Sequence, residues 1–399
     1  MATYEPVDVG RRIFADAVNP ELTIKDVTLR EGEQAAEVNF SLQQKLMITD
    51  RLVDAGVTMI QGGYPGRSKV DREFIETLKK VDCPASIEAI VQIYTKDWRE
   101  QIDIAVDSGA DSINLMYPAS DLRLDYVQKV SRDEALRQIA ECIPYSVDKG
   151  IRTRFSPTDA TRAHLPFLLQ TYEVAVNAGA TDVGCSDTAG CMTPEGVEYL
   201  VKTIMEKFDV TVHLHCHNDF GLALANCLAG VKAGATIIDA SINGLGERAG
   251  NVDMAQAVTS LQHLYKVDLG VDMQKLTGLS QIVAELSGVA VPDNYPLTGA
   301  NSFSHKLDAH VYGLEKNPEV YEFIAPEAVG NTNRIPLGKY TGPYVTKKKL
   351  KEIGLKANDA QIDAIIQQIH EQSIANKRSV TDEEFADIAH SVMKAAAAE

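Results

Sequence analysis

Two histidines separated by one residue, His215 and His217, end a short apolar segment that begins at Val210. In an extended strand, residues i and i+2 point to the same side, so the two imidazoles can converge while Cys216 faces away. Taken alone, such a pair also fits a solvated strand end that binds nothing. A carboxylate from elsewhere in the chain would complete a metal site of two histidines and one carboxylate, with open positions for water and substrate.

A second polar cluster could supply that carboxylate. The segment from Asp26 to Gln34 reads DVTLREGEQ and also follows a short apolar segment. The metal hypothesis therefore depends on whether the fold brings the two segments together.

Length, charge and cysteine usage limit the class of protein. The 399 residues suffice for one barrel-sized domain and a smaller appendage. A net charge of −17 argues against nucleic acid and anionic membranes as main partners. No targeting signal is visible and no apolar run approaches the ~20 residues that cross a bilayer, so we expect a cytoplasmic protein. Six cysteines without CxxC spacing are expected to be free thiols.

Short apolar segments alternate with amphipathic ones over the first ~250 residues. Several amphipathic segments end in a glycine suited to a left-handed cap, at Gly56, Gly109, Gly179 and Gly234. Eight such units predict an α/β fold, a closed parallel (β/α)8 TIM barrel. An open doubly wound sheet is the alternative, but no GxGxxG follows the first strand. The predicted strands span residues 22–26, 57–62, 86–91, 112–116, 152–156, 182–185, 210–215 and 237–242.

Polar residues recur where these strands end. In TIM barrels the chemistry lies at the C-terminal ends of the strands. For any single residue, such as Asp121 or Asp187, a helix N-cap is the simpler interpretation. For the whole set, a shared barrel mouth explains the placement better. The set comprises Arg30, Glu31, Gln34, Gln61, Asn114, Ser120, Arg154, Ser156, Thr158, Asp159, Ser186, Thr188, His215, His217, Asn243, Glu247 and Asn251.

Four ordered motifs resemble those of the DRE-TIM metallolyase superfamily of acyl-CoA enzymes. They are DVTLREGEQ from Asp26, SDTAG from Ser186, HLHCHNDFGLALAN from His213 and NGLGERAGN from Asn243. Two later segments, LTGANSFSHK from Leu297 with His310 after it and GKYTG from Gly338, resemble the Claisen-condensing branch. That branch contains the isopropylmalate, homocitrate and citramalate synthases, so the resemblance implies condensation of acetyl-CoA with a 2-oxo acid.

The resemblance also implies roles for individual residues. Glu31, His215 and His217 would hold a divalent metal, Mg²⁺, Mn²⁺, Co²⁺ or Zn²⁺, with Asn251 as a further ligand or close neighbour. Arg30 would stabilise the developing alkoxide. His305 or His310, with Tyr321, would manage the acetyl-CoA proton, although Tyr321 also fits an ordinary buried aromatic. The other implied residues are Gln34, Gln61, Asn114, Arg154, Ser156, Thr158 and Thr188 in substrate binding and Glu247 in catalysis.

Two departures from the family pattern both remove negative charge. Gln61 stands where relatives usually have Glu, and Thr158 stands where the condensing enzymes usually have the Glu of Ser-x-Glu. Arg154 matches the arginine that homocitrate synthases use for a distal carboxylate. We therefore expect an acceptor with a second anionic group, namely 2-oxoglutarate, oxaloacetate or phosphonopyruvate. Pyruvate and 2-oxoisovalerate are the alternative acceptors.

The domain prediction is a barrel over residues 1–275, a helical linker with the catalytic histidines over 276–330 and a small helical domain over 331–399. A homodimer is expected. A lyase like hydroxymethylglutaryl-CoA lyase would lack the C-terminal histidine segment, and a carboxyltransferase would need a biotin partner. A non-catalytic sensor of 2-oxo acids would not need the intact metal and arginine positions. No leucine feedback is expected, because the long regulatory domain of many isopropylmalate synthases is missing.

Overall fold

The computed structural model describes residues 21–396 and divides into two compact units between Val291 and Pro292. The predicted barrel boundary lay at 275, earlier than this division. Helix α11 (Leu276–Ser287) belongs to the first unit, where the side-chain amide of Gln44 donates to the Leu286 carbonyl at 3.2 Å. Most of the predicted linker, including the histidine segment, lies in the second unit.

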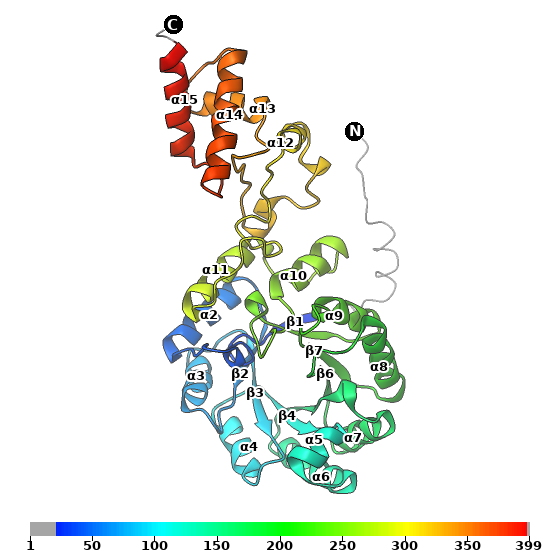
Figure 1. The fold of residues 1–399 in the computed structure, drawn as a ribbon. Coiled ribbons are helices and arrows are strands. Elements are labelled where there is room, and N and C mark those ends of the chain that lie inside the picture. Colours follow the sequence, from blue (N-terminus) through cyan, green and yellow to red (C-terminus); the bar gives the residue numbers. More distant parts are fainter. Residues whose placement is uncertain (1–20, 397–399) are drawn as a thin grey trace. The chain divides into compact units, whose positions relative to one another are not determined.

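The first unit is a closed barrel of eight parallel strands, and each strand pairs with its neighbours in chain order (Figure 1). Strand β1 closes the ring by pairing with β8, with Thr23 opposite Ile237 and Asp26 opposite Ala240. The predicted TIM barrel is confirmed. The strands are β1 (Thr23–Asp26), β2 (Met59–Gly63), β3 (Ser86–Gln92), β4 (Ser112–Pro118), β5 (Arg152–Thr158), β6 (Asp182–Asp187), β7 (Thr211–Cys216) and β8 (Ile237–Ala240).

Helices surround the barrel and connect its strands (Figure 1). The glycine caps form as predicted: Gly56 has φ of +89°, and a Cβ there would lie 2.3 Å from the Gly270 carbonyl oxygen. Only glycine fits such a position without strain. The helices are α2 (Leu42–Asp54), α3 (Lys69–Lys80), α4 (Trp98–Asp107), α5 (Asp121–Arg123), α6 (Arg132–Asp148), α7 (Leu165–Asn177), α8 (Pro194–Lys207), α9 (Ala223–Lys232), α10 (Met254–Thr259) and α11.

A layer of buried charges crosses the barrel interior. Lys25 Nζ lies 2.7 Å from Glu88 Oε2 and 3.2 Å from Asp239 Oδ1. Arg154 lies 3.1 Å from Asp239 and 3.5 Å from Glu88. The four side chains are at most 2% exposed, so each charge depends on its partners for stabilisation. We refer to Lys25, Glu88, Arg154 and Asp239 as the ionic layer.

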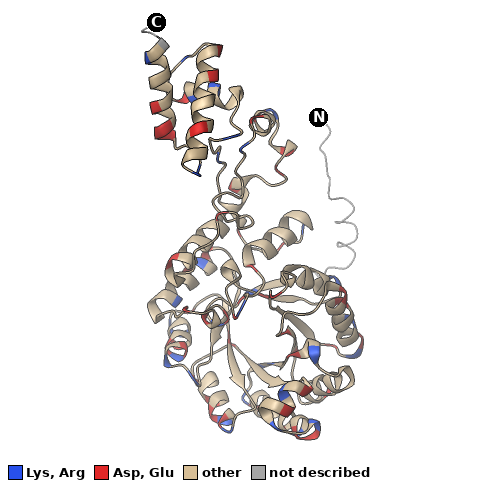
Figure 2. Cartoon of the chain, in the orientation of Figure 1, with Lys and Arg blue, Asp and Glu red and all other residues tan. Residues whose placement is uncertain are grey.

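The second unit is helical and has its own apolar core, in which Leu350, Ile365, Ile369 and Phe385 are buried. It confirms the predicted C-terminal helical region. Acidic and basic residues are interspersed on the helices of both units (Figure 2). No helix within residues 21–396 is long and apolar enough to cross a membrane. The α-helices of this unit are α12 (Asp308–Lys316), α13 (Pro343–Glu352), α14 (Asp359–Ala375) and α15 (Asp382–Ala396).

Candidate active site

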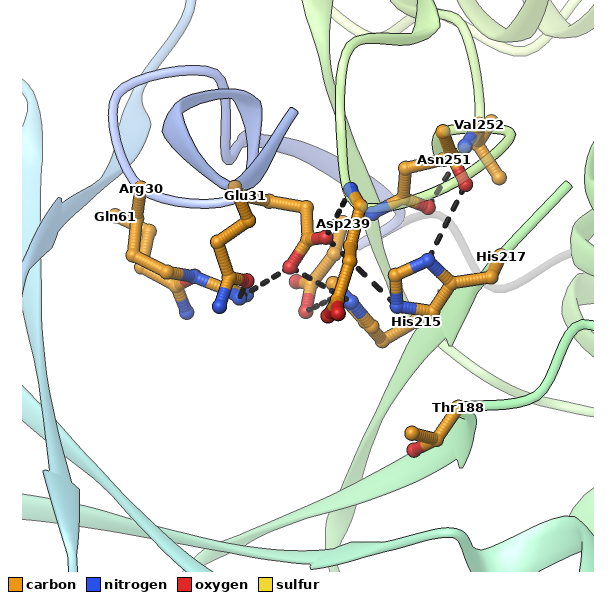
Figure 3. Close-up of polar contacts among 12 residues, drawn as sticks. Arg30, Glu31, Gln61, Thr188, His215, His217, Asp239, Asn251 and Val252 are labelled. Carbon is orange, nitrogen blue, oxygen red and sulfur yellow. Dashed lines mark hydrogen bonds and ion pairs between the residues drawn. The ribbon is translucent and has the colours of Figure 1, made fainter. Parts of the chain in front are cut away.

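The fold brings Glu31, His215 and His217 together at the C-terminal ends of β1 and β7. Nε2 of His215 lies 3.6 Å from Glu31 Oε2, and Nε2 of His217 lies 3.8 Å from Glu31 Oε1. All three side chains are buried, and one potential ligand atom from each lies within 4.8 Å of the others. Figure 3 shows the Glu31 carboxylate between Arg30 and the histidine rings. Two imidazoles and a carboxylate converging at this spacing fit a divalent metal ion.

The second nitrogen of each histidine has a partner that orients its ring. His215 Nδ1 lies 3.3 Å from Asp239 Oδ2, and His217 Nδ1 lies 3.2 Å from the Gly250 carbonyl oxygen. Each Nδ1 therefore faces an oxygen atom, and each Nε2 faces Glu31, where it would ligate a metal ion. This carboxylate–histidine arrangement is typical of histidines that ligate metals.

The cluster combines a neutral imidazole with an ionised carboxylate. Burial lowers the pKa of His217 to about 4, helped by the neighbouring His215, so this ring is neutral near pH 7. Burial also acts to lower the pKa of His215, but hydrogen bonds to Asp239 and then Glu31 raise it overall. Burial alone would raise the pKa of Glu31, yet the charge of Arg30 and the His215 hydrogen bond hold it below its ordinary value. Glu31 is therefore ionised.

Arg30 is held by three side chains beside this cluster. Its guanidinium donates to Glu31, to Gln61 Oε1 at 2.5 Å and to Gln34 Oε1 at 3.0 Å. Gln61 in turn donates to Glu88 of the ionic layer at 2.5 Å. The neutral Gln61 thus connects Arg30 to a buried carboxylate.

Lys45 of α2 holds the loop that carries Arg30 and Glu31. The buried Lys45 Nζ donates to the Leu29 carbonyl at 2.8 Å and to Asp71 at 2.6 Å, and it lies 2.5 Å from Glu33. This lysine was not identified from the sequence. Lys45 lies one helical turn beyond the loop. Its place in the sequence indicated only that it belongs to an amphipathic helix.

A cavity of about 130 Å³ opens beside the cluster, a volume smaller than those of sites for drug-sized ligands. Five of the predicted residues of the first unit do not line it: Gln61, Ser120, Asp159, Asn243 and Asn251. Tyr64, Gln92 and Arg123 line it without having been identified, although Tyr64 and Gln92 fall where strands end. The lining comprises Arg30, Glu31, Gln34, Tyr64, Gln92, Tyr94, Asn114, Met116, Arg123, Arg154, Ser156, Thr158, Ser186, Thr188, His215, His217, Asp239 and Glu247.

Asn251 lies next to His217, with which it forms an isolated backbone bridge. Its Oδ1 accepts the Val252 N–H at 2.7 Å, and its buried Nδ2 has no hydrogen-bond partner within residues 21–396. Thr188 lies apart from the cluster at the end of β6 (Figure 3), and its hydroxyl oxygen accepts the Asp159 N–H at 2.8 Å. That contact leaves the Thr188 O–H free to donate.

The predicted residues of the C-terminal segment form a cluster within the second unit. His305 Nε2 lies 3.0 Å from Glu322 Oε1, and the rings of His310 and Tyr321 stack with centroids 4.1 Å apart. Glu322, also held by Asn333 at 2.9 Å, was not identified from the sequence. Tyr321 is 43% exposed and so is not an ordinary buried aromatic.

Two family models match the chain, in the same order as its two units. The HMGL-like family matches residues 21–283, and the homocitrate synthase post-HMGL domain-like family matches residues 297–378. The first match covers the barrel and the second covers the histidine segment.

Named relatives cover most of the chain. A 2-isopropylmalate synthase of Sulfolobus acidocaldarius is 39% identical over 350 residues, 88% of this chain and 90% of the relative. A putative (R)-citramalate synthase of Methanopyrus kandleri is 36% identical over 386 residues, 96% of this chain and 75% of the relative. The solved HMG-CoA lyase of Bacillus subtilis, 21% identical, shares the barrel fold with a TM-score of 0.60 over 69% of this chain and 96% of that one. The chain therefore belongs to the HMGL-like family, in the Claisen-condensing branch of the DRE-TIM metallolyases.

Proposed function

We propose that the protein condenses acetyl-CoA with a 2-oxo acid and releases CoA and a 2-hydroxy dicarboxylate-type product. The observation that carries this proposal is the convergence of Glu31, His215 and His217 beside Arg30 in a small cavity. When bound there, a divalent metal supplies Lewis acidity toward the 2-oxo acid. The match of residues 297–378 to the homocitrate synthase family favours condensation over the lyase alternative.

The chain's own groups suit the remaining steps. His305, oriented by Glu322, would take a proton from the acetyl methyl group. The resulting carbon nucleophile forms a bond to the keto carbon of the acceptor, and Arg30 stabilises the oxyanion that develops there. The free O–H of Thr188 would donate to the acceptor carboxylate. The oxyanion then takes up a proton and becomes the 2-hydroxy group. Water cleaves the thioester into a carboxylate, a proton and the CoA thiol.

For the acceptor we propose a 2-oxo acid with a second anionic group. Among the described residues that line the cavity, Met116 is the only aliphatic one, which disfavours a branched apolar tail. Thr158, which lines the cavity, is neutral, so it adds no repulsion. The names of the relatives favour the alternative, an isopropylmalate or citramalate synthase acting on 2-oxoisovalerate or pyruvate.

One assay tests both the proposed condensation and the proposed class of acceptor. The purified protein is incubated with acetyl-CoA, one of Mg²⁺, Mn²⁺, Co²⁺ or Zn²⁺, and a panel of 2-oxo acids while free thiol is followed. Thiol release that requires both metal and acceptor supports condensation, and mass spectrometry of the product identifies the new bond. A clear preference for 2-oxoisovalerate or pyruvate would leave condensation standing and refute the charged acceptor.

A further inference from the structure

Arg123 is a cavity-lining guanidinium that pairs with no carboxylate within residues 21–396. The other two arginines of the lining are already neutralised. Arg30 pairs with Glu31, and Arg154 pairs with both Asp239 and Glu88 of the ionic layer. The one hydrogen bond described for the Arg123 side chain runs from Nη1 to the neutral Thr158 Oγ1, at 3.3 Å.

The backbone around Arg123 is held firmly beside β5. The Arg123 N–H donates to Ser120 Oγ at 3.3 Å, and the Ser120 hydroxyl donates to Asp159 at 2.5 Å. The Ala119 N–H donates to the Thr158 carbonyl at 3.0 Å. The nearby Asp121 carboxylate is already bound by Arg132, at 2.8 and 2.7 Å. Arg123 is therefore positioned by its neighbours, while none of the described carboxylates pairs with its charge.

The barrel order places Arg123 across the mouth from the candidate metal site. Glu31 follows β1 and the histidines end β7, and these two strands flank β8. In a closed ring of eight strands, β4 stands opposite β8. Arg123 follows β4 directly, in α5. An acceptor with its 2-oxo end at the cluster would extend its tail toward β4 and β5.

We propose that Arg123 binds the distal anionic group of the acceptor, a carboxylate or a phosphonate. This inference rests on the proposed function and names the residue that selects the acceptor. A guanidinium matches both kinds of anion through paired N–H donors. Arg154, whose charge is shared between two buried carboxylates, serves the ionic layer instead.

The test compares acceptors in three variants, Arg123→Gln, Arg123→Lys and the control Arg137→Gln, which removes an exposed guanidinium from α6. Values of kcat/KM are measured for 2-oxoglutarate, oxaloacetate and phosphonopyruvate against pyruvate. Loss of a charge-assisted hydrogen-bond pair is expected to lower kcat/KM for the preferred dianion by ~10–100-fold in Arg123→Gln. In Arg123→Gln, kcat/KM for pyruvate and KM for acetyl-CoA should change less than ~3-fold. Arg123→Lys should recover part of the lost kcat/KM, and Arg137→Gln should have the wild-type values.

The outcomes separate this inference from the proposed function. Equal losses for all acceptors in Arg123→Gln, or a wild-type protein active only with monoanions, overturn the role of Arg123 while condensation stands. If the wild-type protein releases no thiol with any acceptor, the proposed condensation is refuted. The role of Arg123 is then tested by the binding of 2-oxoglutarate. Calorimetric titration of 2-oxoglutarate into the metal-loaded protein should then show ~10-fold weaker binding to Arg123→Gln, and equal or undetectable binding to both proteins refutes the inference.

Discussion

Nδ1 of His215 lies 3.3 Å from Oδ2 of Asp239, so the candidate metal site and the buried ionic layer share a carboxylate. The same carboxylate faces Lys25 and Arg154. Asp239 therefore orients a potential metal ligand on one side and balances two buried cations on the other.

Asp239→Asn should weaken metal binding by ~10–100-fold, because the His215 ring loses the acceptor that sets its tautomer. Glu88→Gln is the matched control, since Glu88 contacts Lys25, Arg154 and Gln61 but has no contact with His215 among those described. Calorimetric titration with Mn²⁺ or Zn²⁺ measures the affinities. Equal weakening in both variants would mean that the effect comes from the ionic layer as a whole.

His217→Ala should lose most of its bound metal and its thiol-releasing activity, because one of three converging donors is removed. Metal content is measured by mass spectrometry of the protein after dialysis. His164→Ala, which alters an exposed histidine, should keep both properties. Chelation of wild type should abolish activity and added metal should restore it. Full metal content and activity in His217→Ala would refute the site.

His305→Ala should slow thiol release by ~10²–10⁴-fold, the usual contribution of a general base. Metal content and 2-oxo acid binding should be unchanged, because the predicted role of His305 concerns only the acetyl-CoA proton. His390→Ala on α15 is the control for an exposed histidine of the same unit. Wild-type rates in His305→Ala would show that its contact with Glu322 is structural.

Arg154→Met should destabilise the barrel by about 3–5 kcal/mol, because Glu88 and Asp239 would remain buried with Lys25 as their main cation. Urea unfolding measures the loss. The sequence-based hypothesis, in which Arg154 recognises the acceptor tail, predicts instead a selective loss of dianionic acceptors with little change in stability. The two measurements together distinguish these roles.

The buried Asp26 should make stability depend on pH. Burial, partly opposed by hydrogen bonds from Thr28, raises its pKa from 3.8 to about 7. Because the folded state holds the proton more tightly, the stabilising contribution is complete below pH 3.8 and is lost as the pH rises through about 7. The unfolding free energy of Asp26→Asn, minus that of wild type, should increase between pH 5 and pH 7 by up to ~1.4 kcal/mol per pH unit. A constant difference would contradict the raised pKa.

Much of the fold could be predicted because its signals are local. Each strand is a short apolar run, and each glycine cap, such as Gly56, occupies a helix end at which φ is positive. Since the strands pair in chain order, counting them sufficed to predict closure. Polar residues at strand ends, including Glu31 and His215, then meet at one face of the barrel as a consequence of that fold.

Only the tertiary structure decided how the charges are partnered. Lys25, Glu88, Arg154 and Asp239 come from four strands, and nothing local in the sequence indicates that they face one another. Arg154 lies in β5 and Arg123 follows β4. Closure of the barrel places two carboxylates beside Arg154 and, within residues 21–396, none beside Arg123. Charge partnership depends on distances across the barrel, and those distances exist only once the ring of strands has closed.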